Sequence, residues 1–461
     1  MKRTTDIKIT PEMFLSEQPP QRIIGVECEY DIQGMDSAGR SHPASDYISE
    51  KAMAKAGIRN LTKFTENGSR IYQDVGHAEY CTPECLGPYQ AAAADLAGIA
   101  VMSSIVQASG VEHRGLYRIS GTTLLEETDY DKIRFTNGVH ENFMAPGSIA
   151  RSNLFMKLLP SYYATRVATM AGTVSQNTYE FSQKSRGIGG TPIERSYARR
   201  TQAGQKPMAL ALSDELETVG TGWVRVETRF ADAPFSLASR RHALATTSLI
   251  LRLCEHEEIF NQGDFDDILI KQPVVAAHQF MADLSLKSKT EVMSGKNMNM
   301  LAISEKIAKK VLYLCERVEL PEDEVDAAHT WPLIIDAFRR SKPHKAEYDN
   351  YLLKHYSVAT KHYWLDRTGA FAKGDAEAKT RSLQWDRVLP MGNGRNLMEK
   401  TDGQDPEIKK LQTSAPLTRA ALRAQFIIDH HDDPHANAGW NYGSVSQGPT
   451  LKLTDPYGYM I

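Results

Sequence analysis

The chain has 461 residues, with 54 lysines and arginines against 57 aspartates and glutamates, so its formal net charge is −3. This near balance excludes a protein built mainly to coat nucleic acid or an anionic membrane, because counterion release needs a clear basic excess. The longest apolar stretch, around residues 97–106, is too short for a membrane span. The N-terminal segment lacks the apolar run of a signal peptide, and the five scattered cysteines fit a reducing compartment, so we expect a cytoplasmic protein.

The order of the predicted elements places most strands before most helices. Period-two alternation and turn residues predict strands over 22–30, over 69–81, twice within 115–144 and over 222–230. Apolar and alanine-rich patterns predict helices over 88–108, 150–172, 237–260 and most of 296–370. A Gly-, Asp- and Lys-rich linker is predicted over 392–410, followed by a helix over 416–429, a loop with Trp440 and a strand over 450–455. This order favours an α+β fold.

The segment GVECEY carries two glutamates, Glu27 and Glu29. Residues two apart on a strand project from the same face. Two neighbouring carboxylates repel each other unless a cation or an arginine lies between them. The pattern therefore indicates either a strand face that is exposed to solvent or a metal site.

The segment RIYQD places Arg70, Tyr72 and Asp74 on one face of a predicted strand, and Glu79 follows shortly after. Two interpretations stay open for this set. One is a hydrogen-bonded structural triad. The other combines a phosphate contact from the arginine, a metal contact from the tyrosine and a catalytic base from the aspartate.

Two further strands carry polar residues with the same spacing. His140 and Asn142 share a face in GVHEN, and Arg225, Glu227 and Arg229 alternate in RVETR. The arginine–glutamate alternation is either a surface ladder of ion pairs or a device that grips anionic oxygens beside a divalent cation. On one curved sheet, the four strands would line a single channel for Mg²⁺ and a triphosphate, since oxygen-rich ligation with few thiols favours Mg²⁺ or Mn²⁺.

These residues resemble a known family. GVECEY, NGSRIYQDVGHAEYCTPE and GVHENFM are similar to the signature segments of the Pup ligase and Pup deamidase (depupylase) family, which belongs to the carboxylate-amine ligases related to glutamine synthetase. The tail, with TSAPLTRAALRAQFI, Trp440 and LKLTDPYGY, resembles the small C-terminal domain of those enzymes. The resemblance implies a large glutamine-synthetase-like domain over 1–398, with a curved, mostly antiparallel sheet backed by helices, and a small C-terminal domain over 399–461.

The resemblance also implies ATP and Mg²⁺ as cofactors and suggests roles for single residues. Asp74 is expected to be the catalytic carboxylate, acting as base in a ligase or as nucleophile in a deamidase. The resemblance and the strand patterns together lead us to expect metal ligands at Glu27, Glu29, Tyr72, Glu79, His140 and Glu227. Arg225 and Arg229 are expected to act in catalysis, and the expected nucleotide contacts are Arg70, Thr82, Asn142 and Trp440.

The implied reaction is ATP-dependent formation of an isopeptide bond. A small ubiquitin-like carrier protein with a C-terminal glutamate would be phosphorylated on its side-chain carboxylate and joined to a lysine of an acceptor protein. Where the Pup enzymes usually carry a histidine, this chain has Glu227 and adds Arg229, which resembles glutamine synthetase itself. Three alternatives therefore stay open: a depupylase or deamidase, a ligase that joins a small amine to an amino acid or peptide, and a nucleotide-sensing protein without activity. The modest segment between Tyr30 and Asn67 favours a ligase.

Overall fold

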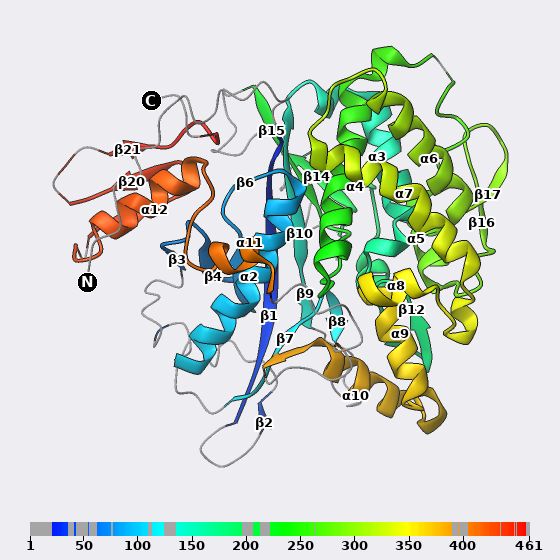
Figure 1. Cartoon of the computed structure of the whole chain (residues 1–461), viewed down its shortest axis with the longest axis horizontal. Coiled ribbons are helices and arrows are strands. Elements are labelled where there is room, and N and C mark those ends of the chain that lie inside the picture. The colour runs from blue at the N-terminus through cyan, green and yellow to red at the C-terminus, as the bar shows by residue number, and fades with distance from the viewer. Residues whose placement is uncertain are drawn as a thin grey trace.

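The computed structural model describes residues 21–35, 41–42, 54, 62–74, 77–108, 113–123, 135–195, 206–212, 222–261, 263–389, 395, 404–433, 435–446, 448 and 450–457. Figure 1 shows three parts along the longest direction of the molecule. A sheet stands in the centre, a layer of helices lies on one side of it, and a small unit from the C-terminal part of the chain lies on the other side.

The sheet in the described part of the chain has 12 strands, and its main path runs β13-β14-β15-β10-β1-β5-β4-β3. β6 pairs with one end of β1, while β2 and β7 pair with its other end, and β18 pairs with β7. All of these neighbours are antiparallel except β13 and β14. The bounds are β1 (Ile23–Met35), β2 (Ser41–His42), β3 (Thr62–Phe64), β4 (Arg70–Asp74), β5 (His77–Cys81), β6 (Cys85–Leu86), β7 (His113–Arg118), β10 (Val139–Pro146), β13 (Ile193–Glu194), β14 (Ala209–Leu212), β15 (Trp223–Thr228) and β18 (Arg387–Leu389).

The long strand β1 determines the two faces of the sheet. Its side chains alternate, so Val26, Cys28 and Tyr30 are fully buried on the core face. Glu27 and Glu29 project from the opposite face. The alternation that packs the core therefore also places the carboxylates together on the other side of the sheet.

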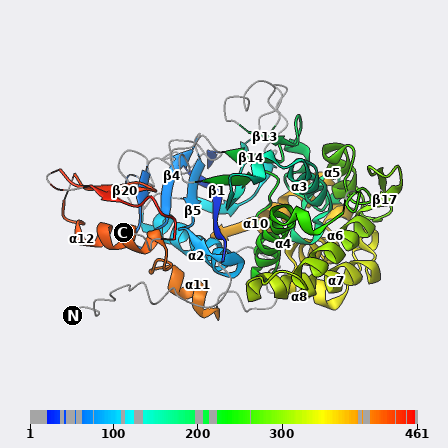
Figure 2. The same ribbon diagram turned by 90° about the horizontal axis from the view of Figure 1, so that it is seen from above.

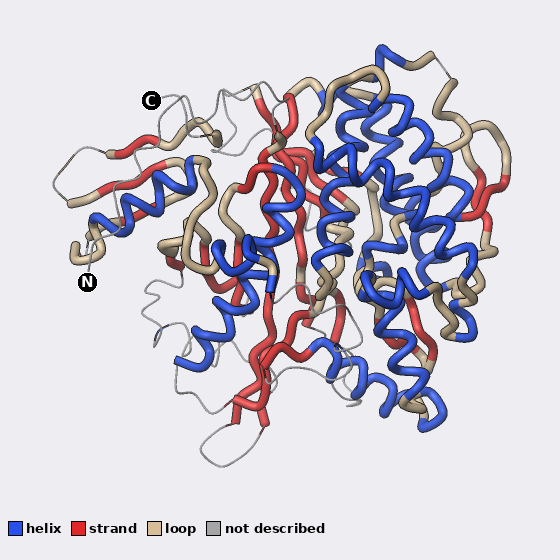
Figure 3. Tube along the Cα trace, viewed as in Figure 1, coloured by secondary structure: helices blue, strands red, loops and turns tan. Residues whose placement is uncertain are grey.

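Helix α2 (Gly87–Ala108) covers the core face and packs against β1, α4 (Leu237–Glu255) and α11 (Pro406–Leu411). Figure 2 shows α2 beneath the strands, with α3, α5, α6, α7 and α8 gathered around α4 on one side and α11 and α12 on the other. Figure 3 shows that this helical layer contains little strand. The layer comprises α3 (Asn153–Thr165), α5 (Pro273–Ala282), α6 (Met300–Cys315), α7 (Glu322–Arg340), α8 (Asn350–His355), α9 (Ser357–Arg367) and α10 (Asp375–Asp386), with short two-stranded pieces β8 (Gly121–Thr123) with β9 (Phe135–Asn137), β11 (Thr173–Ser175) with β12 (Thr178–Glu180), and β16 (Lys289–Glu291) with β17 (Asn297–Asn299).

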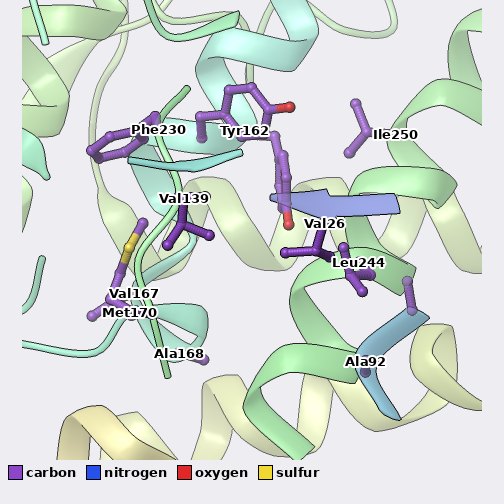
Figure 4. Close-up of a cluster of buried hydrophobic side chains, with 14 of the residues drawn as sticks. Val26, Ala92, Val139, Tyr162, Val167, Ala168, Met170, Phe230, Leu244 and Ile250 are labelled. Atoms are coloured by element: carbon purple, nitrogen blue, oxygen red, sulfur yellow. The ribbon is translucent and has the colours of Figure 1, made fainter. Parts of the chain in front are cut away.

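The core lies between the sheet and these helices. Val26 of β1, Val139 of β10 and Ala92 of α2 meet Leu244 and Ile250 of α4 in one buried cluster (Figure 4). All five side chains are at most 1% exposed, so each contributes close to its full hydrophobic free energy. The core therefore fixes the position of the strands that carry the polar face.

A network of buried ion pairs joins the sheet to α2 and α4. Arg118 and Arg240 pair with Asp95, while Arg166 and Arg240 pair with Glu141. Buried charges are tolerated only when they are paired and hydrogen-bonded. The three arginines also donate to backbone carbonyls of the loop that follows Arg229, namely those of Phe230, Asp232 and Pro234. The network therefore holds the segment beside one of the predicted catalytic arginines.

The small unit consists of α12 (Arg419–Asp429) and a three-stranded sheet of β19 (Asn437–Ala438), β20 (Tyr442–Ser444) and β21 (Leu451–Lys452). It packs on the turn between β3 and β4. Gly68 in that turn has φ +77°, and a Cβ there would approach Ala420 of α12 to 3.0 Å. Glycine therefore suits both the turn and the close contact between the two parts.

The structure differs from the predicted elements in four places. The segment 69–81 contributes two strands, β4 and β5, and 115–144 contributes four strands, because a period-two pattern does not show where one short strand ends and the next begins. The predicted linker over 392–410 contains α11, and most of the rest of it lies outside the described residues. The prediction that no apolar stretch is long enough to span a membrane was wrong for α2, since alanine and glycine extend its apolar composition, although 56% of its most apolar window is buried in the fold.

Candidate active site

Cross-strand pairing brings the predicted site residues into neighbouring rows on one face of the sheet. Glu27 lies opposite His140 of β10 and opposite Cys81 of β5. In the next row, Glu79 lies between Glu29 and Tyr72. On the other side of β10, Asn142 lies opposite Glu227 and Met144 opposite Arg225.

A cleft of about 440 Å³ opens on this face. Ten of the thirteen predicted site residues line it: Glu27, Arg70, Tyr72, Asp74, Thr82, His140, Asn142, Arg225, Arg229 and Trp440. The other three, Glu29, Glu79 and Glu227, are at most 7% exposed and lie on the same strands. Ile23, Met144 and Val224 add apolar lining. The cleft thus combines acidic, basic and apolar walls.

Two groups of donors in the cleft fit a metal ion. Glu27, Glu79 and His140 form one group, and Glu29, Asp74 and Glu79 form the other. Within each group, one donor atom per residue lies within 4.8 Å of all the others. Nδ1 of His140 lies 3.0 Å from Oε2 of Glu27. Glu79 belongs to both groups, so it lies at the centre of the carboxylates Glu27, Glu29, Asp74 and Glu79, which we call the acidic wall.

The electrostatics of this wall indicate a cation. Burial, followed by repulsion from Glu27 and Glu29, raises the pKa of Glu79 well above its ordinary value. Burial likewise raises the pKa of Glu29, although the backbone N–H of Gly138 donates to it at 2.6 Å. Burial and the neighbouring thiol of Cys81 raise the pKa of Tyr72. A divalent cation bound to these oxygens would relieve the repulsion, and the oxygen-dominated donor set fits Mg²⁺.

The arginine–glutamate alternation of β15 forms a compact charged cluster. Nη2 of Arg225 lies 3.2 Å from Oε2 of Glu227, and Nη2 of Arg229 pairs with Oε1 of the same carboxylate. Nη1 of Arg225 also donates to Oδ1 of Asn142 at 2.6 Å. His140 Nδ1 lies 3.7 Å from Oε1 of Glu227. Glu227 therefore orients both guanidinium groups, and it lies at the edge of the acidic wall.

Three of the predicted nucleotide contacts, Thr82, Arg70 and Trp440, also contact other residues of the protein. Oγ1 of Thr82 accepts a hydrogen bond of 2.9 Å from the backbone N–H of Val26, so this hydroxyl fixes β1 as well as lining the cleft. The guanidinium of Arg70 lies 4.2 Å from the centre of the Tyr72 ring. Trp440 comes from the small unit, and its ring meets the ring of Phe64 edge to face at 5.0 Å.

Four residues near the cleft were not predicted as part of the site. Gly138 lies so close to the acidic wall that a Cβ would approach Oε1 of Glu29 and Nε2 of His140 to 2.9 Å. The glycine that precedes the predicted histidine in GVHEN was the available signal. The others are Glu84, Arg419 and Arg423, which form a buried ion-pair cluster, and Glu84 and Arg419 also line the cleft.

The chain is similar to proteins of one family. The family model described as Pup-ligase protein matches residues 22–443. A Pup–protein ligase of Acidimicrobium ferrooxidans is 25% identical over 326 residues, which cover 69% of each chain. A Pup deamidase/depupylase of Mycobacterium tuberculosis is 26% identical over 289 residues, which cover 61% of this chain and 54% of the relative.

Solved structures share the fold. The ligase PafA in its complex with the prokaryotic ubiquitin-like protein Pup superposes with a TM-score of 0.78 at 18% identity, covering 96% of this chain and 90% of that one. PafA in complex with ADP superposes with a TM-score of 0.71 at 18% identity, covering 90% and 91%. The expected α+β architecture with a mostly antiparallel sheet is confirmed. Because the family match spans most of the sequence, the chain belongs to the Pup-ligase protein family.

Proposed function

We propose that the protein is an ATP-dependent carboxylate-amine ligase that joins the side-chain carboxylate of a C-terminal glutamate on a Pup-type carrier protein to a lysine of an acceptor protein. The observation that carries this proposal is the cleft itself. It places Tyr72, Asp74 and the buried carboxylates beside the guanidinium groups of Arg225 and Arg229. Such a combination suits phosphoryl transfer, where anionic oxygens are held between cations and arginines.

The first step activates the carboxylate. A carboxylate oxygen of the carrier attacks the γ-phosphorus of ATP, the bond from that phosphorus to the bridging oxygen breaks, and ADP leaves with an acyl phosphate formed. Arg225 and Arg229 are proposed to hold the equatorial oxygens of the transferred group. Glu227 keeps the two guanidinium groups oriented, so little reorganisation accompanies the transfer.

The second step forms the isopeptide bond. A lysine amine attacks the acyl carbon, and phosphate leaves with the electron pair of the C–O bond. The amine must lose a proton, and Asp74 is proposed to accept it as general base. Asp74 is exposed at the end of β4 and lines the cleft, where an incoming lysine can reach it.

Mg²⁺ is proposed to be held by Glu27, Glu29, Tyr72, Glu79, His140 and Glu227, and the donor atoms of Glu27, Glu79 and His140 lie together at one position. When bound, it neutralises charge on the phosphate oxygens. Arg70, Thr82, Asn142 and Trp440 are proposed to contact the nucleotide. We also propose that the reaction takes place in the cytoplasm and that the small C-terminal domain spans 399–461.

The proposal is tested by incubating the purified protein with ATP, Mg²⁺, a Pup protein that ends in glutamate, and a lysine-bearing acceptor. A ligase produces conjugate and ADP together, and omission of any one component stops both. Loss of a preformed conjugate without net ATP consumption would favour the depupylase, which the similarity to the Mycobacterium tuberculosis deamidase keeps as the second candidate. ADP formation from glutamate and small amines without any carrier would favour the small-molecule ligase.

A further inference from the structure

Arg423 of α12 joins the small unit to the catalytic strands. Its Nη1 donates to the backbone carbonyl of Trp440 at 3.0 Å, and its Nη2 donates to the backbone carbonyl of Gly68 at 3.0 Å. The guanidinium also pairs with the carboxylate of Glu84. One fully buried side chain therefore contacts the Trp440 loop, the turn before β4 and the segment after β5.

The guanidinium also lies beside two aromatic rings that contact each other. Its central carbon is 4.9 Å from the ring centre of Phe64 and 4.9 Å from that of Trp440. These distances are within the range of cation–π attraction, which strengthens where water is excluded. The indole of Trp440 therefore contacts both Phe64 and Arg423, which also contact each other.

The contacts of Arg423 coincide with the predicted nucleotide contacts. Gly68 lies two residues before Arg70, and Phe64 is the cross-strand partner of Arg70. Glu84 lies two residues after Thr82. Arg423 thus touches neighbours of Arg70 and Thr82, two of the three predicted contacts from the large domain, and the loop that carries Trp440.

Glu84 is the anchor of this arrangement. Its carboxylate accepts from Nε of Arg419 at 2.6 Å and from Nη1 of Arg423 at 3.2 Å. Burial alone would raise the pKa of Glu84, but the charges of Arg423 and Arg419 outweigh it and lower the pKa to about 2. Glu84 is therefore ionised at neutral pH. Arg419 extends the link further, since its Nη1 donates to the backbone carbonyl of Leu453 at 3.1 Å.

We propose that Arg423, anchored by Glu84, is a positioning residue that completes the nucleotide end of the cleft by docking the Trp440 loop onto the strands that carry Arg70 and Thr82. This inference rests on the proposed function, because it requires that Trp440 contacts the nucleotide. It demands a guanidinium rather than any positive charge. A planar fork donates in several fixed directions while it contacts two rings, which an ammonium cannot do.

The test is the substitution Arg423→Lys, assayed in the full-length protein with ATP, carrier and acceptor. The KM for ATP should rise about tenfold or more, in line with the loss of charged hydrogen bonds. The kcat at saturating ATP and the KM for the carrier should stay within about twofold of wild type, because the reacting groups are untouched. A residue with a purely structural role would instead lower the active fraction, so kcat would fall and the KM for ATP would stay the same.

Tyr89→Phe is the matched control. The Tyr89 hydroxyl donates to the Asp405 carboxylate at 3.0 and 2.8 Å, which also links the large domain to the C-terminal part of the chain, but Tyr89 does not contact Trp440. This variant should leave the KM for ATP unchanged. Should Arg423→Lys fail to fold, Glu84→Gln carries the same test, since it removes the anchor and leaves Arg423 in place.

Calorimetric titration with ADP separates this inference from the proposed function. Wild-type protein that binds no ADP overturns both. If Trp440→Ala weakens ADP binding while Arg423→Lys and Glu84→Gln do not, only the inference is overturned. If all three weaken binding and the double variant of Arg423→Lys with Trp440→Ala is no weaker than Trp440→Ala alone, the inference holds. Fully additive losses would contradict it.

Discussion

Glu29 and Glu79 are direct cross-strand partners on β1 and β5, and both carboxylates are buried. Like charges that face each other on neighbouring strands destabilise a sheet. The repulsion therefore lowers the stability of the metal-free protein, and a bound cation would restore that stability.

Glu79→Gln is expected to stabilise the metal-free protein by about 1 kcal/mol, because it removes the repulsion at the centre of the acidic wall. The same substitution should abolish the rise in melting temperature that Mg²⁺ or Mn²⁺ gives to the wild type. Thermal unfolding in a chelator and then with added metal measures both effects. The exposed-residue variant Glu291→Gln serves as control and should respond to metal as the wild type does. A lower melting temperature of Glu79→Gln in chelator would contradict the interpretation.

Asp74→Asn should lower kcat for conjugate formation by at least about 100-fold, since an amide cannot accept the proton of the attacking amine. ADP binding should stay close to that of the wild type, because Asp74 is proposed to act on the attacking amine and not to bind the nucleotide. Single-turnover conjugation and calorimetry with ADP give the two measurements. Asp336→Asn, on the exposed face of α7, is the control with the same change of charge. Unchanged turnover in Asp74→Asn would favour a nucleotide-sensing protein without activity.

Arg229→Lys should lower kcat by about 100-fold, comparable to the loss of one preorganised donor to a transition-state oxyanion. Lysine keeps the charge but loses the fork that Glu227 orients. The KM for ATP should change less than kcat, because the interaction is strongest with the transferring group. Steady-state measurement of ADP release in the presence of carrier separates the two constants. An increase in KM at constant kcat would assign Arg229 to ground-state binding instead.

The pH dependence of stability should reveal the charge of Glu84. Because its pKa in the folded protein, about 2, lies below the ordinary value of 4.5, its contribution is fully present above pH 4.5 and is lost as the pH falls toward 2. The difference in free energy of unfolding between wild type and Glu84→Gln should shrink by about 3 kcal/mol over that window. Urea titrations at several pH values measure it. A difference that is constant with pH would show that Glu84 is not held ionised by its arginines.

The buried ion pairs behind the sheet should be far more costly to break than exposed ones. Asp95→Asn leaves Arg118 and Arg240 without their full counter-charge, and we expect a loss of about 3 kcal/mol or more in the free energy of unfolding. Lys379→Ala removes an i,i+4 pair with Asp375 on the surface of α10 and should cost less than about 1 kcal/mol. Chemical denaturation of both variants makes the comparison, and equal losses would contradict it.

Local geometry explains why much of the site could be predicted from the sequence. Side-chain direction on a strand is set by the pleat, so the spacing of Glu27 and Glu29, or of Arg225 and Glu227, was sufficient to place each pair on one face. The convergence of the four strands was inferred from the polar residues that they share, although no single strand pattern identifies the neighbours of that strand. The roles of the thirteen residues stay predictions until the variants above are measured.

Contacts between distant segments explain what could not be predicted. Glu84 and Arg423 are 339 positions apart, and no sequence pattern around either residue predicts that they form an ion pair. The period of a strand also does not mark where one strand ends and the next begins, so the separation of 69–81 into β4 and β5 was not predicted. The GVHEN pattern indicated a role for His140 and Asn142, and it gave no reason to assign one to Gly138. Its small size matters because Glu29 and His140 approach from both sides.

Helix α2 is apolar, and one of its packing partners, α4, is translated only later. Strands β1, β4 and β5 precede α2 in the chain and can pair as soon as they leave the ribosome, which gives the helix one apolar surface on which to dock. Its other large neighbour, α4, is translated much later. A nascent chain paused between these helices therefore exposes an apolar helix that is long enough to enter a lipid bilayer. Early pairing of β1, β5 and β4 is expected to give one face of this helix a docking surface before α4 is translated.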